Sequence, residues 1–188
     1  MEKKKYLPLK VIHLAFMVLG LCFYAYSLSR VKESLLFTRG FIVGSLQSIT
    51  AILTLVSGFL YLTHGYRKNA AAYYKGFVWI LLIKEIISTV AGNTSSVYLN
   101  KFIWTICLVL LTILTVGKDL GKTKSFTLVG LILAGKIILL INYISIMDAL
   151  GAAGISVVMD MVGQIILTIT TALMVCGKYL DKESRGAK

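Results

Sequence analysis

Lys84, Glu85 and Lys136 are charged residues in the middle of two long apolar stretches, 76–92 and 126–147. A charge at the centre of a bilayer costs about 2.5–3.5 kcal/mol on insertion scales, so such residues face protein or water and mark functional sites. Neighbouring helix positions point about 100° apart, so Glu85 is expected to pair with Lys136 on another helix. That pairing leaves Lys84 for an anionic group of a solute or lipid. The alternative is a purely stabilising pair, with the second lysine reaching a helix-end carbonyl.

Further polar residues recur on single helical faces. One face carries Asp160, Gln164, Thr168 and Thr171; a second carries Gln47, Thr50, Thr54, Ser57 and Tyr61; Asn100, Thr105, Thr112 and Thr115 follow a less regular pattern. Hydroxyl residues also pack membrane helices together, so their role stays open. The amides and Asp160 are costlier to bury and favour a site. With Asn142, they place a polar cavity in the outer half of the membrane, above the two lysines. The predicted ligand-binding residues are Lys84, Lys136, Glu85, Asn142, Asp160, Gln164, Gln47 and Asn100.

The elements that must position these residues are membrane-spanning helices. The chain has 188 residues, of which 57% are hydrophobic and 15% charged, against about 25% charged in soluble domains. Its mean hydropathy is +0.84. A spanning helix needs roughly 20 apolar residues, and continuous runs exclude a β-barrel, whose strands alternate. We therefore predict one all-α transmembrane domain over 1–188. Its six helices are expected at about 7–27, 41–63, 76–92, 98–116, 126–147 and 156–176.

The first stretch has an alternative interpretation as a secretory signal peptide. Its charged start, Glu2–Lys5, and the small residues around Ala25-Tyr26-Ser27 resemble such a signal. We favour a span because the apolar run is long enough to cross the bilayer.

The basic residues indicate the orientation of the helices. Of the 20 lysines and arginines, 14 lie in the N-terminus, the second and fourth loops and the C-terminus, whereas Arg30, Lys32, Arg39 and Lys101 lie on the opposite side. Cytoplasmic loops carry the excess of Lys and Arg. Both termini are therefore expected in the cytoplasm, with the protein in the plasma or inner cell membrane.

The net charge of +12 does not indicate a nucleic-acid partner. The basic loops are short and lack an aromatic stacking platform, although Tyr73 and Tyr74 adjoin Lys75. Topology and contact with anionic lipid account for the charge. The lipid bilayer is the partner that the composition predicts.

Glycines followed by cations end the even-numbered spans and suggest an internal repeat. Gly65, Gly117 and Gly177 are the three glycines, and each is expected to cap its helix, since glycine adopts the left-handed conformation and cations suit the helix C-terminus. Lys84 follows Gly65 by 19 residues, as Lys136 follows Gly117. We predict three tandem helical hairpins, a pattern that helix capping alone could also produce.

No catalytic or cofactor motif is present. Cys22, Cys107 and Cys176 lie singly in different spans without a C-x-x-C pattern, and neither H-E-x-x-H nor G-x-S-x-G occurs. His13 and His64 lie at similar depth and are weak candidates for a metal or haem site. We expect no cofactor and no enzyme.

Two functions of different classes remain. The first is transport or binding of a small polar solute, preferably anionic, or of a lipid headgroup. The second is an accessory, immunity or assembly protein that binds a partner membrane protein or a second copy through helix contacts. The size, six spans and cytoplasmic termini are similar to those of substrate-binding subunits of energy-coupling-factor vitamin transporters. The segment that carries the similarity, Ala15–Gly20, is too short to identify a family.

Overall fold

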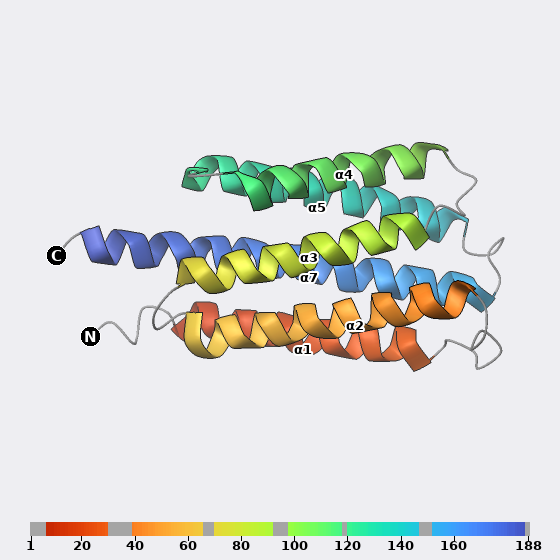
Figure 1. Cartoon of the computed structure of the whole chain (residues 1–188), viewed down its shortest axis with the longest axis horizontal. Coiled ribbons are helices and arrows are strands. Elements are labelled where there is room, and N and C mark those ends of the chain that lie inside the picture. Colours follow the sequence, from red (N-terminus) through yellow and green to blue (C-terminus); the bar gives the residue numbers. More distant parts are fainter. Residues whose placement is uncertain are drawn as a thin grey trace.

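The computed structural model describes residues 7–29, 39–65, 70–91, 98–117, 120–146 and 152–186. Within these residues the chain forms long helices that run up and down one bundle (Figure 1). They are α1 (Leu7–Ser29), α2 (Arg39–Leu60), α3 (Ala70–Ala91), α4 (Tyr98–Val116), α5 (Lys122–Ser145) and α7 (Ala152–Gly186), and the short π-helix η3 (Tyr61–Gly65) continues α2. The start of α1 and the end of α7 lie at the same end of the bundle (Figure 1).

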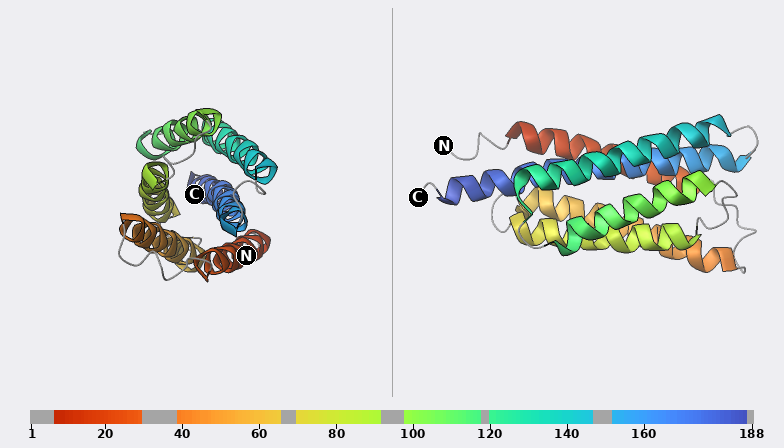
Figure 2. Two further views of the ribbon diagram at one scale, coloured as in Figure 1. Left: turned by 90° about the vertical axis from the view of Figure 1, so that its right-hand side faces the viewer. Right: turned by 90° about the horizontal axis from the view of Figure 1, so that it is seen from above.

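Helix α7 is the central element of the bundle. Figure 2 shows α1 to α5 following one another around it. α7 packs most extensively on α1 and α5 and also contacts α3, while the outer helices contact their chain neighbours. The inner face of the ring and the surface of α7 therefore form one continuous core, which includes Met17, Phe77, Leu167 and Met174.

Three helices in the described part of the chain are long and apolar enough to cross a membrane. They are Leu99–Val116 in α4, Lys122–Ser145 in α5 and Val157–Tyr179 in α7. Shorter apolar segments, Leu7–Phe23 and Ile49–Gly65, lie in α1 and in α2 with η3. Many large apolar side chains point outward, among them Phe102, Ile141 and Val109. Such a surface suits a lipid environment. The chain is thus an all-helical protein compatible with a membrane.

Two of the three predicted glycines lie at helix ends, but neither has the left-handed conformation of the predicted cap, and the third lies inside a helix. Gly65 ends η3 and Gly117 follows α4, where its N–H donates to the Ile113 carbonyl at 2.9 Å. Gly177, however, is buried inside α7, which continues to Gly186. The prediction of a cap at Gly177 is wrong because the residues after it are held by tertiary contacts. Lys178 lies over Tyr74, and the Tyr179 hydroxyl donates to the Leu120 carbonyl.

The hydroxyl residues of the polar stripes bond to their own helices. Thr54 donates to the Thr50 carbonyl, Thr168 to Gln164 and Thr171 to Leu167, at 2.7–2.9 Å. A hydroxyl bonded in this way is satisfied where a threonine is buried in an apolar interior. The intrahelical bonds satisfy these hydroxyl donors, and the choice between helix packing and a site stays open for these residues.

The helix pairs of the three predicted hairpins are packed to different extents. α5 and α7 pack closely, α3 and α4 less so, and α1 packs mainly on α7 rather than on α2. The best-packed outer pairs, α2 with α3 and α4 with α5, join different predicted hairpins. The packing alone therefore does not delimit a repeat.

Candidate functional site

The centre of the bundle holds the ion pair that the sequence predicts. Lys136 of α5 lies with its Nζ 2.5 Å from Oε1 of Glu85 on α3. Each of the two residues is 2% exposed. The predicted pairing of Glu85 with Lys136 is confirmed. Because water cannot solvate either charge here, each depends on the other and on nearby polar groups for its stability.

Two residues of α7 extend this pair. Lys136 Nζ also donates to Gln164 Oε1 at 3.3 Å, and Gln164 Nε2 donates to Asp160 Oδ2 at 2.6 Å. The ring of Trp104 on α4 lies 5.9 Å from the same ammonium group, within the range of a cation–π contact. Residues of three other helices therefore contact Lys136 of α5. They are Glu85 of α3, Trp104 of α4 and Gln164 of α7.

Lys84 belongs to the same cluster. Its side chain is 2% exposed, and its charge acts on the Glu85 carboxylate together with that of Lys136. Lys84 is therefore electrostatically coupled to the Glu85–Lys136 pair, and its predicted role toward an anionic group of a ligand stays a prediction. Consecutive residues can still share one environment, since lysine is long enough to bend toward its neighbour. We call Lys84, Glu85, Lys136 and Gln164 the central cluster.

A second polar contact lies toward the end of the bundle opposite the two termini. Asn142 Nδ2 of α5 donates to Asn100 Oδ1 of α4 at 3.0 Å. Asn142 is six residues beyond Lys136, which is about 9 Å along the helix. Asn100 is fully buried. Asn100 and Asn142 therefore share a region with the central cluster but form a separate hydrogen bond.

Of the remaining candidates, the two histidines lie apart from the central cluster, and the side chain of Gln47 lies outside the described residues. His13 is buried against Tyr61, with ring centroids 5.8 Å apart, whereas His64 is exposed and stacks on Tyr73. Among the described residues, no three His, Cys, Asp or Glu side chains gather as a metal site requires.

The structure adds contacts that sequence reasoning missed. Trp104 beside Lys136 is one of them. Tyr61, in the π-helix, is another: its hydroxyl donates to the Met174 carbonyl of α7 at 2.9 Å. Single-turn π segments often mark special positions in helices, but the sequence around Tyr61 gives no sign of one. Both contacts depend on which helix faces which, and helix periodicity does not encode that.

The chemistry available to the central cluster is charge recognition. Lys136 bonds to the Glu85 carboxylate and Lys84 acts on it electrostatically, so the formal charges of the three residues sum to one excess positive charge. Asp160, half-buried beyond Gln164, adds a carboxylate on the side facing Asn100 and Asn142. Charges act strongly at short range in a low-dielectric interior. Such an arrangement suits a small molecule with an anionic group and a polar or cationic remainder.

These features define an all-helical bundle with a buried charged cluster around its central helix. No family model, no curated protein and no solved structure matches the chain.

Proposed function

We propose that the protein is a multi-pass membrane protein that binds or transports a small polar solute, preferably anionic, or a lipid headgroup. The observation that supports this is the central cluster. Ionisable residues deep in a helical membrane bundle are costly and are functional by default. A network that joins three helices also suits a transported ligand, since such sites lie near the middle of the membrane between packed helices.

In the proposed topology all six helices span the membrane, with both termini in the cytoplasm. The bundle supports an even number of spans, because the start of α1 and the end of α7 lie at one end (Figure 1). The basic residues assign that end to the cytoplasm. The central cluster then lies near the middle, and Asp160, Asn100 and Asn142 lie in the outer half.

The internal repeat remains part of this proposal. Lys84 and Lys136 occupy equivalent places 19 residues after Gly65 and Gly117. Both lysines act on the Glu85 carboxylate. A repeat would explain why two helices, α3 and α5, each place a lysine at the same level of the bundle.

A thermal-shift screen of the purified full chain tests the solute-binding function. The probes are inorganic phosphate, sulfate, small carboxylates and amino acids. We expect at least one probe to stabilise the wild type and to lose its effect on Lys84→Met. Lys101→Met is the control, because Lys101 lies at the start of α4, away from the cluster. The proposal fails if no probe acts, or if Lys84→Met responds like the wild type.

The second candidate is the accessory or assembly protein, and one observation favours it. On the outer face of α5, Gly130 and Ala134 are exposed, and a Cβ at Gly130 would meet nothing within 4 Å. Small residues four apart let a second helix approach closely. Under this candidate, Gly130→Ile removes co-purification of a partner or a second copy. Under the solute-binding function it leaves probe binding intact.

A further inference from the structure

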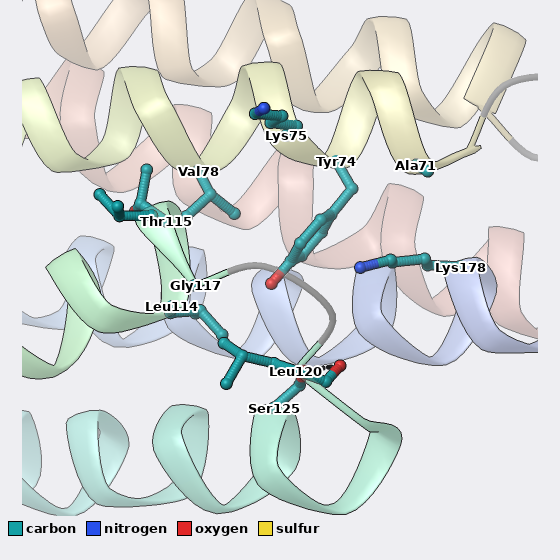
Figure 3. Close-up of a pocket in the computed structure, with 11 residues that line it drawn as sticks. Ala71, Tyr74, Lys75, Val78, Leu114, Thr115, Gly117, Leu120, Ser125 and Lys178 are labelled. Atoms are coloured by element: carbon teal, nitrogen blue, oxygen red, sulfur yellow. Dashed lines mark hydrogen bonds between the residues drawn. The ribbon is translucent and has the colours of Figure 1, made fainter.

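A pocket lies at the end of the bundle where α7 ends, away from the central cluster. It has a volume of about 300 Å³ and is bounded by the start of α3, the end of α4, the start of α5 and the late part of α7 (Figure 3). Tyr74 precedes Glu85 by 11 residues, so the two sites are about 16 Å apart along α3. The central cluster therefore does not account for this pocket.

A buried hydroxyl without a partner points into the pocket. Tyr74 is 6% exposed, and its Oη is directed into the space between α3 and α5 (Figure 3). Within the described residues this oxygen has no hydrogen-bond partner. A buried polar group is normally satisfied, and an exception calls for an explanation such as an absent ligand. Burial raises the pKa of Tyr74 above its ordinary value, so the hydroxyl stays protonated and can donate.

A lysine accompanies the Tyr74 hydroxyl. Lys178 of α7 lines the pocket, with its Nζ 5.1 Å from the ring of Tyr74 and 5.4 Å from that of Tyr179. Lys75 lines it from the exposed rim. Among the described residues neither lysine has a carboxylate partner. The pocket therefore offers donors and positive charge, which is the chemistry that binds a phosphate group.

The pocket lies at the boundaries of the predicted spans. Lys75 immediately precedes the span 76–92, Gly117 immediately follows 98–116, and Lys178 follows 156–176 by two residues. All three helices thus meet the pocket where apolar sequence ends. This is the depth at which lipid headgroups lie. The basic segments at this end of the bundle add attraction for an anionic lipid.

We propose that this pocket binds the phosphate of an anionic phospholipid headgroup, with Lys178 as the cation and the Tyr74 hydroxyl as a hydrogen-bond donor. The acyl chains would then lie along the apolar outer surface of the helices. The shared chemistry is the phosphate group, so a free phosphate is the competing source. This site is separate from the central cluster, and its test does not depend on the proposed solute.

Native mass spectrometry of the full chain, released from nanodiscs of phosphatidylcholine and phosphatidylglycerol, tests the proposal. We expect the wild type to retain one phosphatidylglycerol in preference to phosphatidylcholine. Lys178→Gln should reduce that retention by about tenfold or more, as expected for losing a charge-assisted hydrogen bond. Tyr74→Phe keeps the ring under Lys178 and removes only the hydroxyl, so it should lower retention by a smaller factor. Lys124→Gln is the control, because Lys124 is exposed at the same end but does not line the pocket.

The possible results of these measurements distinguish a phospholipid headgroup from free phosphate as the ligand of this pocket. Equal retention by Lys178→Gln and Lys124→Gln overturns the proposal, as does a wild type without a preference for phosphatidylglycerol. A thermal shift with inorganic phosphate that is lost in Lys178→Gln, together with phosphatidylglycerol retention that millimolar phosphate abolishes, overturns the lipid as the source. Retention that survives millimolar inorganic phosphate supports it. Unfolding temperatures of the variants show whether any loss reflects misfolding, and Tyr74→Phe gives an independent result if Lys178→Gln is unstable.

Discussion

Gly135 of α5 faces Cys107 of α4 so closely that a Cβ on the glycine would lie 2.6 Å from the cysteine Sγ. The thiol in turn donates to the Ile132 carbonyl at 3.8 Å. The close approach of α4 and α5 therefore depends on the missing side chain. It also holds Trp104, on α4, at the level of Lys136.

We expect Gly135→Ala to destabilise the protein, because overfilling a packed contact costs about 1–3 kcal/mol. Gly130→Ala on the same helix is the matched control. Its Cβ meets nothing within 4 Å, so the change should be neutral or should add up to about 1 kcal/mol from helix propensity. Thermal unfolding in detergent measures both. Adding Cys107→Ala should restore part of the loss in Gly135→Ala. Equal effects of the two glycine changes would contradict this account.

Glu85→Gln is expected to lower stability strongly. It leaves Lys136 without its carboxylate in a site that is 2% exposed, and breaking a buried pair in this way costs roughly 3–5 kcal/mol in soluble proteins. The double variant Glu85→Gln with Lys136→Met should recover part of the loss, since the unpaired ammonium is gone. Unfolding temperatures of the wild type, the Glu85→Gln and Lys136→Met single variants and the double variant complete the cycle. A Glu85→Gln protein as stable as the wild type would show that the pair has no energetic role.

Tyr61→Phe should lower the free energy of unfolding by about 1 kcal/mol, the usual net value of a buried hydrogen bond. The ring remains beside His13, and the hydrogen bond from the hydroxyl to the Met174 carbonyl is lost. Unfolding in a denaturing detergent titration measures the difference. Thr63→Val is the control, because the exposed Thr63 hydroxyl bonds locally to carbonyls of α2. The Tyr61 contact is unimportant if both changes have the same effect.

Cysteine labelling tests the proposed topology. In a protein with its three cysteines replaced, a cysteine at Gly121 should react with an impermeant thiol reagent only after the cells are opened. A cysteine at position 34 should react in intact cells, because the connection of α1 to α2 is proposed to be external. Protection of position 34 in intact cells would reverse or refute the orientation.

The sequence predicted α4 to the residue, and predicted the starts and ends of other helices less well. The apolar segment 98–116 comes after the polar residues 93–96 and is followed by Gly117. The hydropathy pattern and the residues that signal helix ends therefore agree there. α7 extends ten residues beyond its predicted end at 176, because contacts of Lys178 and Tyr179 override the signal of Gly177. Helix propensity is a weak prior that tertiary packing overrides.

The Glu85–Lys136 pair could be predicted because the cost of a buried charge demands a partner and few candidates exist. The pocket at Tyr74 and Lys178 could not, because these residues are 104 positions apart by their numbers in the sequence, and nothing in either local pattern links them. The ligand-binding roles of the central cluster, of Asn100 and of Asn142 stay predictions.

The place of α7 inside the ring has a consequence for biogenesis. α7 follows α1 to α5 in the chain and fills the space that they surround (Figure 2). While a ribosome is still making it, the nascent chain has Glu85 and Lys136 but lacks Gln164, and the inward faces of five helices have no central helix to contact. The bundle can therefore reach its final packing only after α7 has been synthesised, because only then do the inner faces of the other helices gain the central helix that they pack against.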